Sequence, residues 1–171
     1  SKRCSEILKR ISKKQIEEDK FFSSTKLENL LEEIINSFKE TSSKEIILVS
    51  NNDKNKIDIQ RSAEMIYGLR NFIGNANKFS KSKVFINLKS DNDFTEITIE
   101  DDGDGYPSDI LSKIGEPYLK SSDKNSGLGL GLFIGKTLLE KNFANVNCWN
   151  SQTRSGAEVT IKWKNKDLFN L

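Results

Sequence analysis

The chain has 171 residues, of which 35% are hydrophobic and 30% charged, as expected for one polar globular domain. Its 27 basic and 25 acidic residues leave a net charge of +2, which does not favour a nucleic-acid-binding protein. The absence of histidine excludes histidine-based acid–base chemistry and histidine metal ligands within the chain. Two cysteines make no disulfide framework and favour a reducing, cytoplasmic compartment. No apolar run approaches the about 20 residues of a membrane span, and the polar opening does not indicate a signal peptide.

The hydrophobic pattern predicts a series of helices and strands in chain order. Residues 2–19 and 23–40 are expected to form helices, and Ser24 or Thr25 is expected to cap the second one. The further predicted elements are strands at 44–50 and 56–60, a helix at 61–80, paired strands at 82–90 and 93–101, a helix at 129–142, and strands at 144–150 and 157–163. This mixture predicts an α/β (α+β) fold, a two-layer sandwich.

Glycine and proline are concentrated in one stretch. None of the ten glycines precedes Gly68, whereas six of them and both prolines lie between Gly103 and Gly131. Irregular stretches longer than about 12–15 residues in a compact domain are usually functional or disordered. We therefore expect one long irregular segment among the regular elements, and this segment is a candidate for a functional site.

The helix predicted at 61–80 has one polar side. Asn71, Asn75 and Lys78 project within roughly 60° of one another at about 100° per residue, with Phe79 at the border. The opposite, core-facing side consists of Met65, Leu69, Phe72, Ile73 and Ala76. The polar side is either a solvated face or a set of amides and one ammonium that meet a Mg²⁺–phosphate unit.

Asp101 ends the second of the paired strands and continues the core-facing row of Ile97 and Ile99. A carboxylate there is unfavourable unless a hydrogen-bond donor meets it. The donor is either a backbone group of the following turn or the exocyclic amine of a purine. Gly103 and Gly105 would let the backbone approach a flat ligand closely or adopt a positive φ. The other carboxylates of this stretch are expected to face solvent: Asp102 and Asp104.

Gly127, Gly129 and Gly131 alternate at the start of the helix predicted at 129–142. The beginning of a helix offers free N–H groups and a positive dipole end to phosphates, although a flexible hinge would have the same composition. The P-loop motif fails because Leu130 stands where it needs glycine, and the dinucleotide fingerprint lacks its third glycine. Gly135 is better explained by close packing.

Three motifs in a fixed order, NFIGNANKF, DDGDGYP and GLGLG, resemble the N, G1 and G2 boxes of the histidine-kinase catalytic domain of the GHKL ATPase superfamily. Between them, GEPYLKSS resembles the F box. The sequences of these motifs are similar to those of redox-sensing kinases of the RegB/PrrB type. The resemblance covers about residues 25–163. It implies a Bergerat-type mixed sheet covered on one face by three helices in residues 21–171, a lid at about 115–128, and the end of a dimerisation helix in residues 1–20.

The resemblance also implies roles for single residues. Asp101 would bind the adenine amino group, Asn75 would ligate Mg²⁺, and Asn71 would support the phosphates of ATP. The other implied ATP contacts are Gly103 and Gly105 around the adenine, Phe79 beside the base, Lys78 and Lys120 at the phosphates, and Gly127, Leu128, Gly129, Leu130 and Gly131 along them.

The implied reaction passes the γ-phosphoryl group of Mg·ATP to a histidine on the dimerisation domain of the same kinase, and then to a response regulator. Because this chain has no histidine, the acceptor must lie outside it. The parent protein is expected to be dimeric and membrane-anchored, with this domain in the cytoplasm. The chain departs from the family pattern at Tyr67. Many relatives carry a polar side chain at this position, which is thought to assist phosphoryl transfer.

Two other functions remain open. An anti-sigma-type serine kinase would share the superfamily, but the redox-kinase resemblance and the helical residues 1–19 argue against it. A non-catalytic docking module is disfavoured by the intact Asn75 and Asp101. Cys4 either forms a redox-sensitive bridge to its twin in a dimer or is a free thiol, and Cys148 is expected in the core.

Overall fold

The computed structural model describes residues 3–12, 24–51, 57–114 and 128–169. Residues 3–12 form a helix whose side chains are exposed, including Ile7, Leu8 and Ile11. The rest of the helix predicted at 2–19 lies outside the described residues, and its part in dimerisation stays a prediction. Among the described helices, none is both long and apolar enough to cross a membrane.

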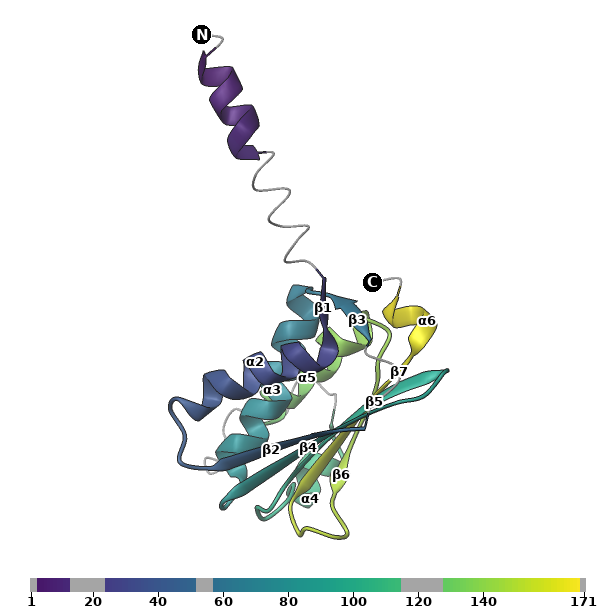
Figure 1. The fold of residues 1–171 in the computed structure, drawn as a ribbon. Coiled ribbons are helices and arrows are strands. Elements are labelled where there is room, and N and C mark those ends of the chain that lie inside the picture. The colour runs from purple at the N-terminus through teal and green to yellow at the C-terminus, as the bar shows by residue number, and fades with distance from the viewer. Residues whose placement is uncertain (1–2, 13–23, 52–56, 115–127, 170–171) are drawn as a thin grey trace.

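Five strands form one mixed sheet in the order β2-β4-β5-β7-β6, in which β2 and β4 are parallel and the other neighbours antiparallel. Helices α2, α3 and α5 cover one face of this sheet, which confirms the predicted two-layer sandwich (Figure 1). Strands β1 and β3 form a separate antiparallel pair. The elements are β1 (Ser24–Lys26), α2 (Leu27–Lys39), β2 (Glu45–Ser50), β3 (Asp58–Gln60), α3 (Ala63–Phe79), β4 (Lys83–Ser90), β5 (Phe94–Asp101), α4 (Ser108–Leu111), α5 (Leu128–Lys141), β6 (Asn145–Asn150), β7 (Ala157–Lys164) and α6 (Asn165–Leu168).

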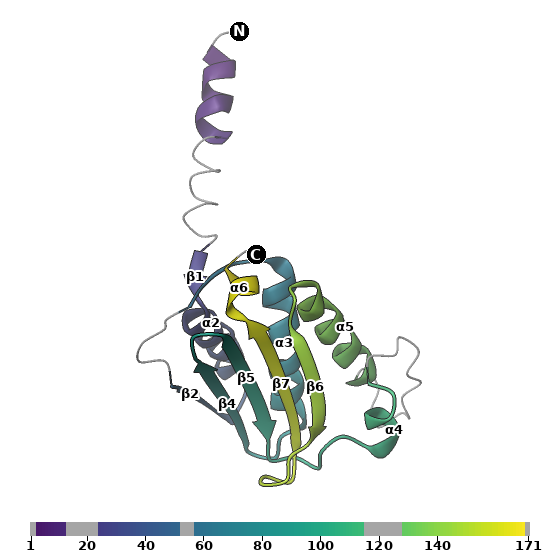
Figure 2. The same cartoon turned by 90° about the vertical axis from the view of Figure 1, so that its right-hand side faces the viewer.

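The core lies between the sheet and the helices, because each element buries one side of its hydrophobic pattern. In α3 the five residues predicted to face the core are all buried. Every second residue is buried from Val84 to Leu88 in β4, and from Thr95 to Asp101 in β5. Figure 2 shows α3 behind the sheet and α5 beside β6, and the two helices pack against each other. A methyl group at Gly135 of α5 would lie 2.8 Å from the Phe72 ring, so the predicted close packing there is confirmed.

The predicted cap of the second helix is wrong. Helix α2 begins after Lys26, and neither Ser24 nor Thr25 caps it, because both lie in β1 and pair with β3. The backbone N–H of Leu27, one of the groups that a cap would serve, donates instead to the Ile57 carbonyl at 3.0 Å. A strand pairing across the chain thus replaces the local cap.

Two short helices were not predicted. Helix α4 interrupts the glycine-rich stretch and buries Ile110, so this stretch is not irregular throughout. Helix α6 follows β7 directly and is held by Asn165, whose Oδ1 accepts from the Thr95 hydroxyl at 2.7 Å. Four-residue helices are too short for the periodicity of a sequence to indicate them.

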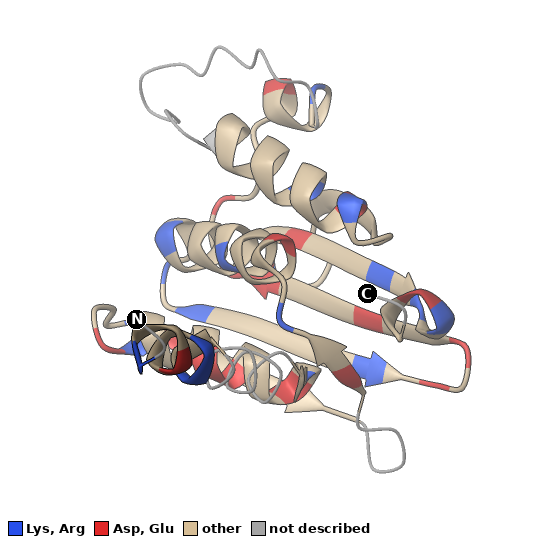
Figure 3. Cartoon of the chain, turned by 90° about the horizontal axis from the view of Figure 1, so that it is seen from above, with Lys and Arg blue, Asp and Glu red and all other residues tan. Residues whose placement is uncertain are grey.

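Charged residues of both signs are interspersed over the helices and strands, consistent with the small net charge (Figure 3). Lysines near the start of β4 have acidic neighbours: Lys81 pairs with Asp104 at 3.2 Å, and Lys83 lies 3.9 Å from Glu45. Exposed pairs of this kind contribute about 0–1 kcal/mol to stability. These lysines therefore belong to a solvated surface.

Candidate functional site

A pocket of about 240 Å³ lies between the C-terminal half of α3 and the adjoining ends of β5 and β7. Its lining is mostly apolar with a few polar groups, which is the usual composition of a small-molecule site. The lining residues are Phe72, Asn75, Ala76 and Phe79 of α3, Ile99 and Asp101 of β5, Asp104, Gly105, Tyr106 and Pro107 of the following loop, and Ala157 and Val159 of β7.

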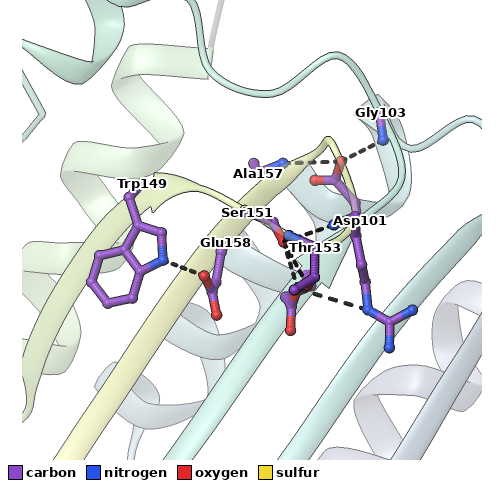
Figure 4. A network of polar contacts seen from close by, with 9 residues as sticks. Asp101, Gly103, Trp149, Ser151, Thr153, Ala157 and Glu158 are labelled. Carbon is purple, nitrogen blue, oxygen red and sulfur yellow. Dashed lines mark hydrogen bonds and ion pairs between the residues drawn. The ribbon is translucent and has the colours of Figure 1, made fainter.

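Asp101 is the buried carboxylate of this pocket, with 3% of its surface exposed. Its Oδ1 accepts hydrogen bonds from the backbone N–H groups of Gly103 at 2.8 Å and Ala157 at 3.3 Å (Figure 4). The backbone donor of the following turn that the sequence left open is therefore present. Within the described residues, both bonds go to Oδ1 and none to Oδ2, so one oxygen of a pocket-lining carboxylate has no protein donor.

Burial raises the pKa of Asp101 above its usual range, and the two backbone hydrogen bonds only partly oppose this effect. The folded chain thus holds a carboxylate whose charge is incompletely compensated. A ligand that donates a hydrogen bond to this oxygen would stabilise the charged form.

Glycines let the chain close around Asp101. A methyl group at Gly156 would lie 2.0 Å from the Asp101 carbonyl oxygen, and one at Gly103 would lie 2.2 Å from the Phe79 carbonyl oxygen. Gly105 has a φ of +79°, in the left-handed region that favours glycine. The predicted positive φ is present at Gly105, and Gly103 and Gly156 lie close to neighbouring backbone, whereas close approach to a ligand stays a prediction.

Tyr106 forms a buried part of the pocket wall, with 7% of its surface exposed. Its hydroxyl lies beside the thiol of Cys148, and burial raises the pKa of both groups, that of Cys148 to about 12. Both side chains are therefore neutral near pH 7. Cys148 packs partly buried against the hydrophobic core, as predicted.

The helix side of the pocket contains two of the predicted residues, Asn75 and Phe79. The Asn75 Nδ2 is buried without a hydrogen-bond partner in the described part of the chain. Lys78 is exposed, with its Nζ 5.2 Å from the centre of the Phe79 ring at the pocket margin. Asn71 does not line the pocket, and its amide donates to the Tyr67 carbonyl at 2.8 Å.

The predicted glycine run lies at the beginning of α5, of which Leu128 is the first residue. A methyl group at Gly131 would lie 3.1 Å from the Asn75 amide, so the first turn of α5 packs next to α3 at the pocket. Gly129 is buried and Leu130 is 57% exposed. Lys120, Gly127 and the rest of the predicted lid, residues 115–127, lie outside the described residues.

Asp102 is partly exposed and is hydrogen-bonded to the chain, whereas the Asp104 side chain is 92% exposed, as expected. Asp102 accepts hydrogen bonds from the backbone N–H groups of Lys81, Ser82 and Lys83, and from the Ser82 hydroxyl at 2.6 Å. Desolvation alone would raise the pKa of Asp102, but these bonds outweigh it and hold the pKa well below the usual range. The carboxylate thus joins the end of β5 to the start of β4.

Sequence reasoning missed several lining residues, above all Tyr106, Ala157 and Val159. The position of Tyr106 directly after Gly105 was a usable signal, because the loop was already assigned to the site. Ala157 is 56 positions from Asp101 and reaches it only through the pairing of β5 with β7. No local pattern indicates such a pairing.

Residues 60–167 match the family model of the histidine kinase-, DNA gyrase B- and HSP90-like ATPases. The match extends over more than half of the chain, and the chain therefore belongs to this family. This finding confirms the resemblance that the motifs indicated.

Among its relatives, the sensor histidine kinase RegB of Cereibacter sphaeroides is 38% identical over 130 residues, which are 65% of this chain and 28% of RegB. The chain thus aligns with less than a third of that relative.

Two solved structures share the fold. The mycobacterial sensor histidine kinase MprB has a TM-score of 0.68 at 18% identity, covering 84% of this chain and 97% of that one. Full-length ShkA in complex with AMPPNP has a TM-score of 0.65 at 22% identity, covering 82% and 31%. At these identities the likeness establishes the fold, and it confirms the predicted mixed sheet with helices on one face.

Proposed function

We propose that this chain is the ATP-binding catalytic domain of a sensor histidine kinase, which presents the γ-phosphate of Mg·ATP to a histidine on the dimerisation domain of the same kinase. The observation that carries the proposal is the buried Asp101 carboxylate, which lines the pocket and has one oxygen without a donor among the described residues. The ShkA structure, which shares the fold, is a complex with AMPPNP. The family match and the RegB relative support the kinase assignment.

In this proposal, Asp101 accepts a hydrogen bond from the exocyclic amine of adenine. Gly103 and Gly105 shape the space around the base, and Phe79 and Tyr106 flank it. A guanine base carries a carbonyl oxygen where adenine carries its amine, so it would place an acceptor against the carboxylate. The pocket is therefore expected to prefer adenine nucleotides, because an unpaired buried charge is costly.

The opposite side of the pocket would hold the phosphates and Mg²⁺. Asn75 lines the pocket and its amide oxygen is of the kind that ligates Mg²⁺, while its buried nitrogen, without a partner among the described residues, would donate to a phosphate oxygen. When bound, Mg²⁺ neutralises charge on the phosphates. Asn71, Lys78 and Lys120 would support the phosphates from the protein, together with the run from Gly127 through Leu128, Gly129 and Leu130 to Gly131.

The contribution of this chain to phosphoryl transfer is mainly positioning, because the reaction needs alignment and charge stabilisation more than covalent help. The chain contains no histidine, so the acceptor belongs to another segment, and a response regulator would receive the group next. In the parent kinase, residues 1–20 would end a dimerisation helix and residues 115–128 would close over ATP. That kinase would be dimeric and membrane-anchored, with this domain on the cytoplasmic side.

The test is a calorimetric titration of Mg·ADP into the chain and into Asp101→Asn, with Mg·GDP as the control ligand. We expect binding of Mg·ADP by the wild type, no measurable binding of Mg·GDP, and at least about a hundredfold loss for Asp101→Asn. Phosphate transfer from ATP to an added histidine-bearing dimerisation fragment then tests the kinase assignment. Absence of nucleotide binding by the wild type would contradict the proposal and favour a docking module.

A further inference from the structure

The last residue of β6 is hydrogen-bonded to the loop that walls the pocket. Asn150 is an exposed residue, yet its side-chain amide pairs with the backbone of Tyr106 in both directions. The Tyr106 N–H donates to Asn150 Oδ1 at 2.6 Å, and Asn150 Nδ2 donates to the Tyr106 carbonyl at 3.1 Å. The amide thus satisfies both backbone groups of a loop residue, as a neighbouring strand would.

The same loop is fitted closely to Asn150. Gly105 has a φ of +79°, and a methyl group there would lie 2.7 Å from Asn150 Oδ1. The loop therefore reaches the amide only with glycine at this position, in a conformation that other residues rarely adopt. Because Gly105 and Tyr106 both line the pocket, the position of the amide determines the position of this part of the wall.

Asn150 lies on a fixed part of the hairpin formed by β6 and β7. The next residue, Ser151, donates from its hydroxyl to Glu100 Oε2 at 2.8 Å, and Arg154 Nε lies 3.7 Å from the same oxygen (Figure 4). Glu100 directly precedes Asp101 in β5. The end of the hairpin is thereby attached to β5, the strand that carries the buried carboxylate. It thus contacts both this strand, at Glu100, and the loop that follows it, at Tyr106.

We propose that Asn150 is a positioning residue for nucleotide binding, which fixes Gly105 and Tyr106 as one wall of the base pocket without touching the nucleotide. The inference rests on the proposed function, because it concerns the same pocket. An exposed asparagine that makes no such contact is usually replaced with little effect. Loss of the Asn150 amide would instead release a wall that folding has already ordered, and the nucleotide would have to order it again.

Calorimetry with Mg·ADP tests this inference on the whole chain, in Asn150→Ala, Asn150→Asp and the control Asn147→Ala. Asn147 is exposed on the same strand, and its amide donates to Asn145 at 3.0 Å, away from the pocket. We expect about tenfold weaker binding in Asn150→Ala and unchanged binding in Asn147→Ala. Asn150→Asp should be intermediate, because it keeps the acceptor for the Tyr106 N–H and loses the donor to its carbonyl.

Hydrogen exchange measured by NMR on the unliganded protein separates positioning from general stability. The Tyr106 amide should be protected in the wild type and exchange faster in Asn150→Ala, while the amides in the middle of β5 remain protected. Equal Mg·ADP affinity in Asn150→Ala and Asn147→Ala, or an unprotected Tyr106 amide in the wild type, would overturn the inference alone. A wild type that binds no nucleotide would overturn the proposed function itself.

Discussion

The two walls of the pocket differ in how far the folded chain satisfies their polar groups. The sheet wall includes Asp101, Gly105, Tyr106 and Ala157, and it is held by hydrogen bonds from backbone N–H groups to side-chain oxygens and by close glycine contacts. Its conformation therefore exists before any ligand arrives. In the proposed function this wall meets the base.

The helix wall includes Asn75 and Phe79 of α3, with the first turn of α5 packed next to Asn75 and the Lys78 Nζ near the Phe79 ring. Here the Asn75 Nδ2 is buried without a partner among the described residues, and the Lys78 side chain is exposed. Its polar groups are thus positioned by a rigid helix and left available. In the proposed function they meet Mg²⁺ and the phosphates.

The difference separates two kinds of recognition. A preformed wall reduces the ordering that a base must impose, which favours affinity and selectivity. Polar groups without partners gain their hydrogen bonds only on binding, so a ligand is stabilised there at little cost to contacts already made. Variants that break the contacts of the sheet wall should therefore lower both stability and nucleotide binding, whereas variants of the helix wall should weaken binding without lowering stability.

The largest effect is expected from Gly156→Ala, which attacks the sheet wall. Its new methyl group would lie 2.0 Å from the Asp101 carbonyl oxygen, so the backbone must move. We expect the free energy of unfolding to fall by about 3 kcal/mol, and Mg·ADP binding to be lost. Denaturant unfolding and calorimetry measure the two effects.

The control for this variant is Gly74→Ala. Its methyl group would meet only the end of the Phe38 ring, at 3.2 Å, and alanine is the better helix former by about 1 kcal/mol. It should retain both stability and binding. If Gly156→Ala bound Mg·ADP as tightly as Gly74→Ala, the sheet wall would not depend on the contact between Gly156 and Asp101.

The second variant, Asn75→Ala, attacks the helix wall. We expect Asn75→Ala to bind Mg·ADP about tenfold more weakly than the wild type does. When Mg²⁺ is removed by a chelator, the variant and the wild type should bind ADP equally well. The free energy of unfolding should rise by about 0.5 kcal/mol, because alanine favours the helix and an unpartnered amide is removed. Calorimetry with and without Mg²⁺, and denaturant unfolding, provide the measurements.

Asn77→Ala is the matched control on the same helix. Asn77 Oδ1 accepts from the Ser42 hydroxyl at 2.9 Å, outside the pocket. Its replacement should lower stability and leave the Mg²⁺ dependence of binding intact. Equal Mg²⁺ dependence in both variants would remove the assignment of Asn75 as a magnesium ligand.

The sequence predicted the helix wall more completely than the sheet wall, for a physical reason. The periodicity of one helix places Asn75 and Phe79 relative to the core, so local spacing suffices. The two-residue alternation of β5 likewise placed Asp101 facing inward, and the structure confirms this.

The remainder of the sheet wall depends on contacts between distant segments. Ala157 meets Asp101 through the register of β5 with β7, and Asn150 meets Tyr106 across 44 positions. The incorrect cap of α2 has the same origin, because the pairing of β1 with β3 displaced a local preference. Side-chain patterns within one segment contain no information on such pairings.

The buried Asp101 carboxylate of the sheet wall is expected to lower the free energy of unfolding at neutral pH. Because burial raises the pKa of Asp101 in the folded chain, the folded state binds its proton more tightly than the unfolded state does. Stability from this group is therefore present below the unfolded pKa and is lost as the pH rises through the folded pKa.

Asp101→Asn cannot ionise, so it avoids the loss of stability that a buried charge causes at neutral pH. It keeps an oxygen for the two backbone donors. At pH 7 the unliganded variant should be about 1 kcal/mol more stable than the wild type, although it has lost nucleotide binding. The gain should shrink as the pH is lowered through the folded pKa of Asp101, as measured by denaturant unfolding at several pH values. Asp104→Asn, at an exposed side chain, should show no such gain.

The smallest effect on nucleotide binding is expected at the neighbouring Asp102, which supports the sheet wall from outside the pocket. The pKa of Asp102 is lowered in the folded chain, so its stabilisation is present at neutral pH and is lost as the pH falls below about 5. Asp102→Ala should lower the free energy of unfolding by about 1 kcal/mol at pH 7, because water replaces the partly exposed acceptor. Mg·ADP affinity should change less than threefold, or about 0.6 kcal/mol. Two adjacent aspartates would then show opposite pH dependence, since burial dominates at Asp101 and hydrogen bonds dominate at Asp102. A difference between Asp102→Ala and the wild type that persisted unchanged at low pH would show that the carboxylate acts through packing and not through its charge.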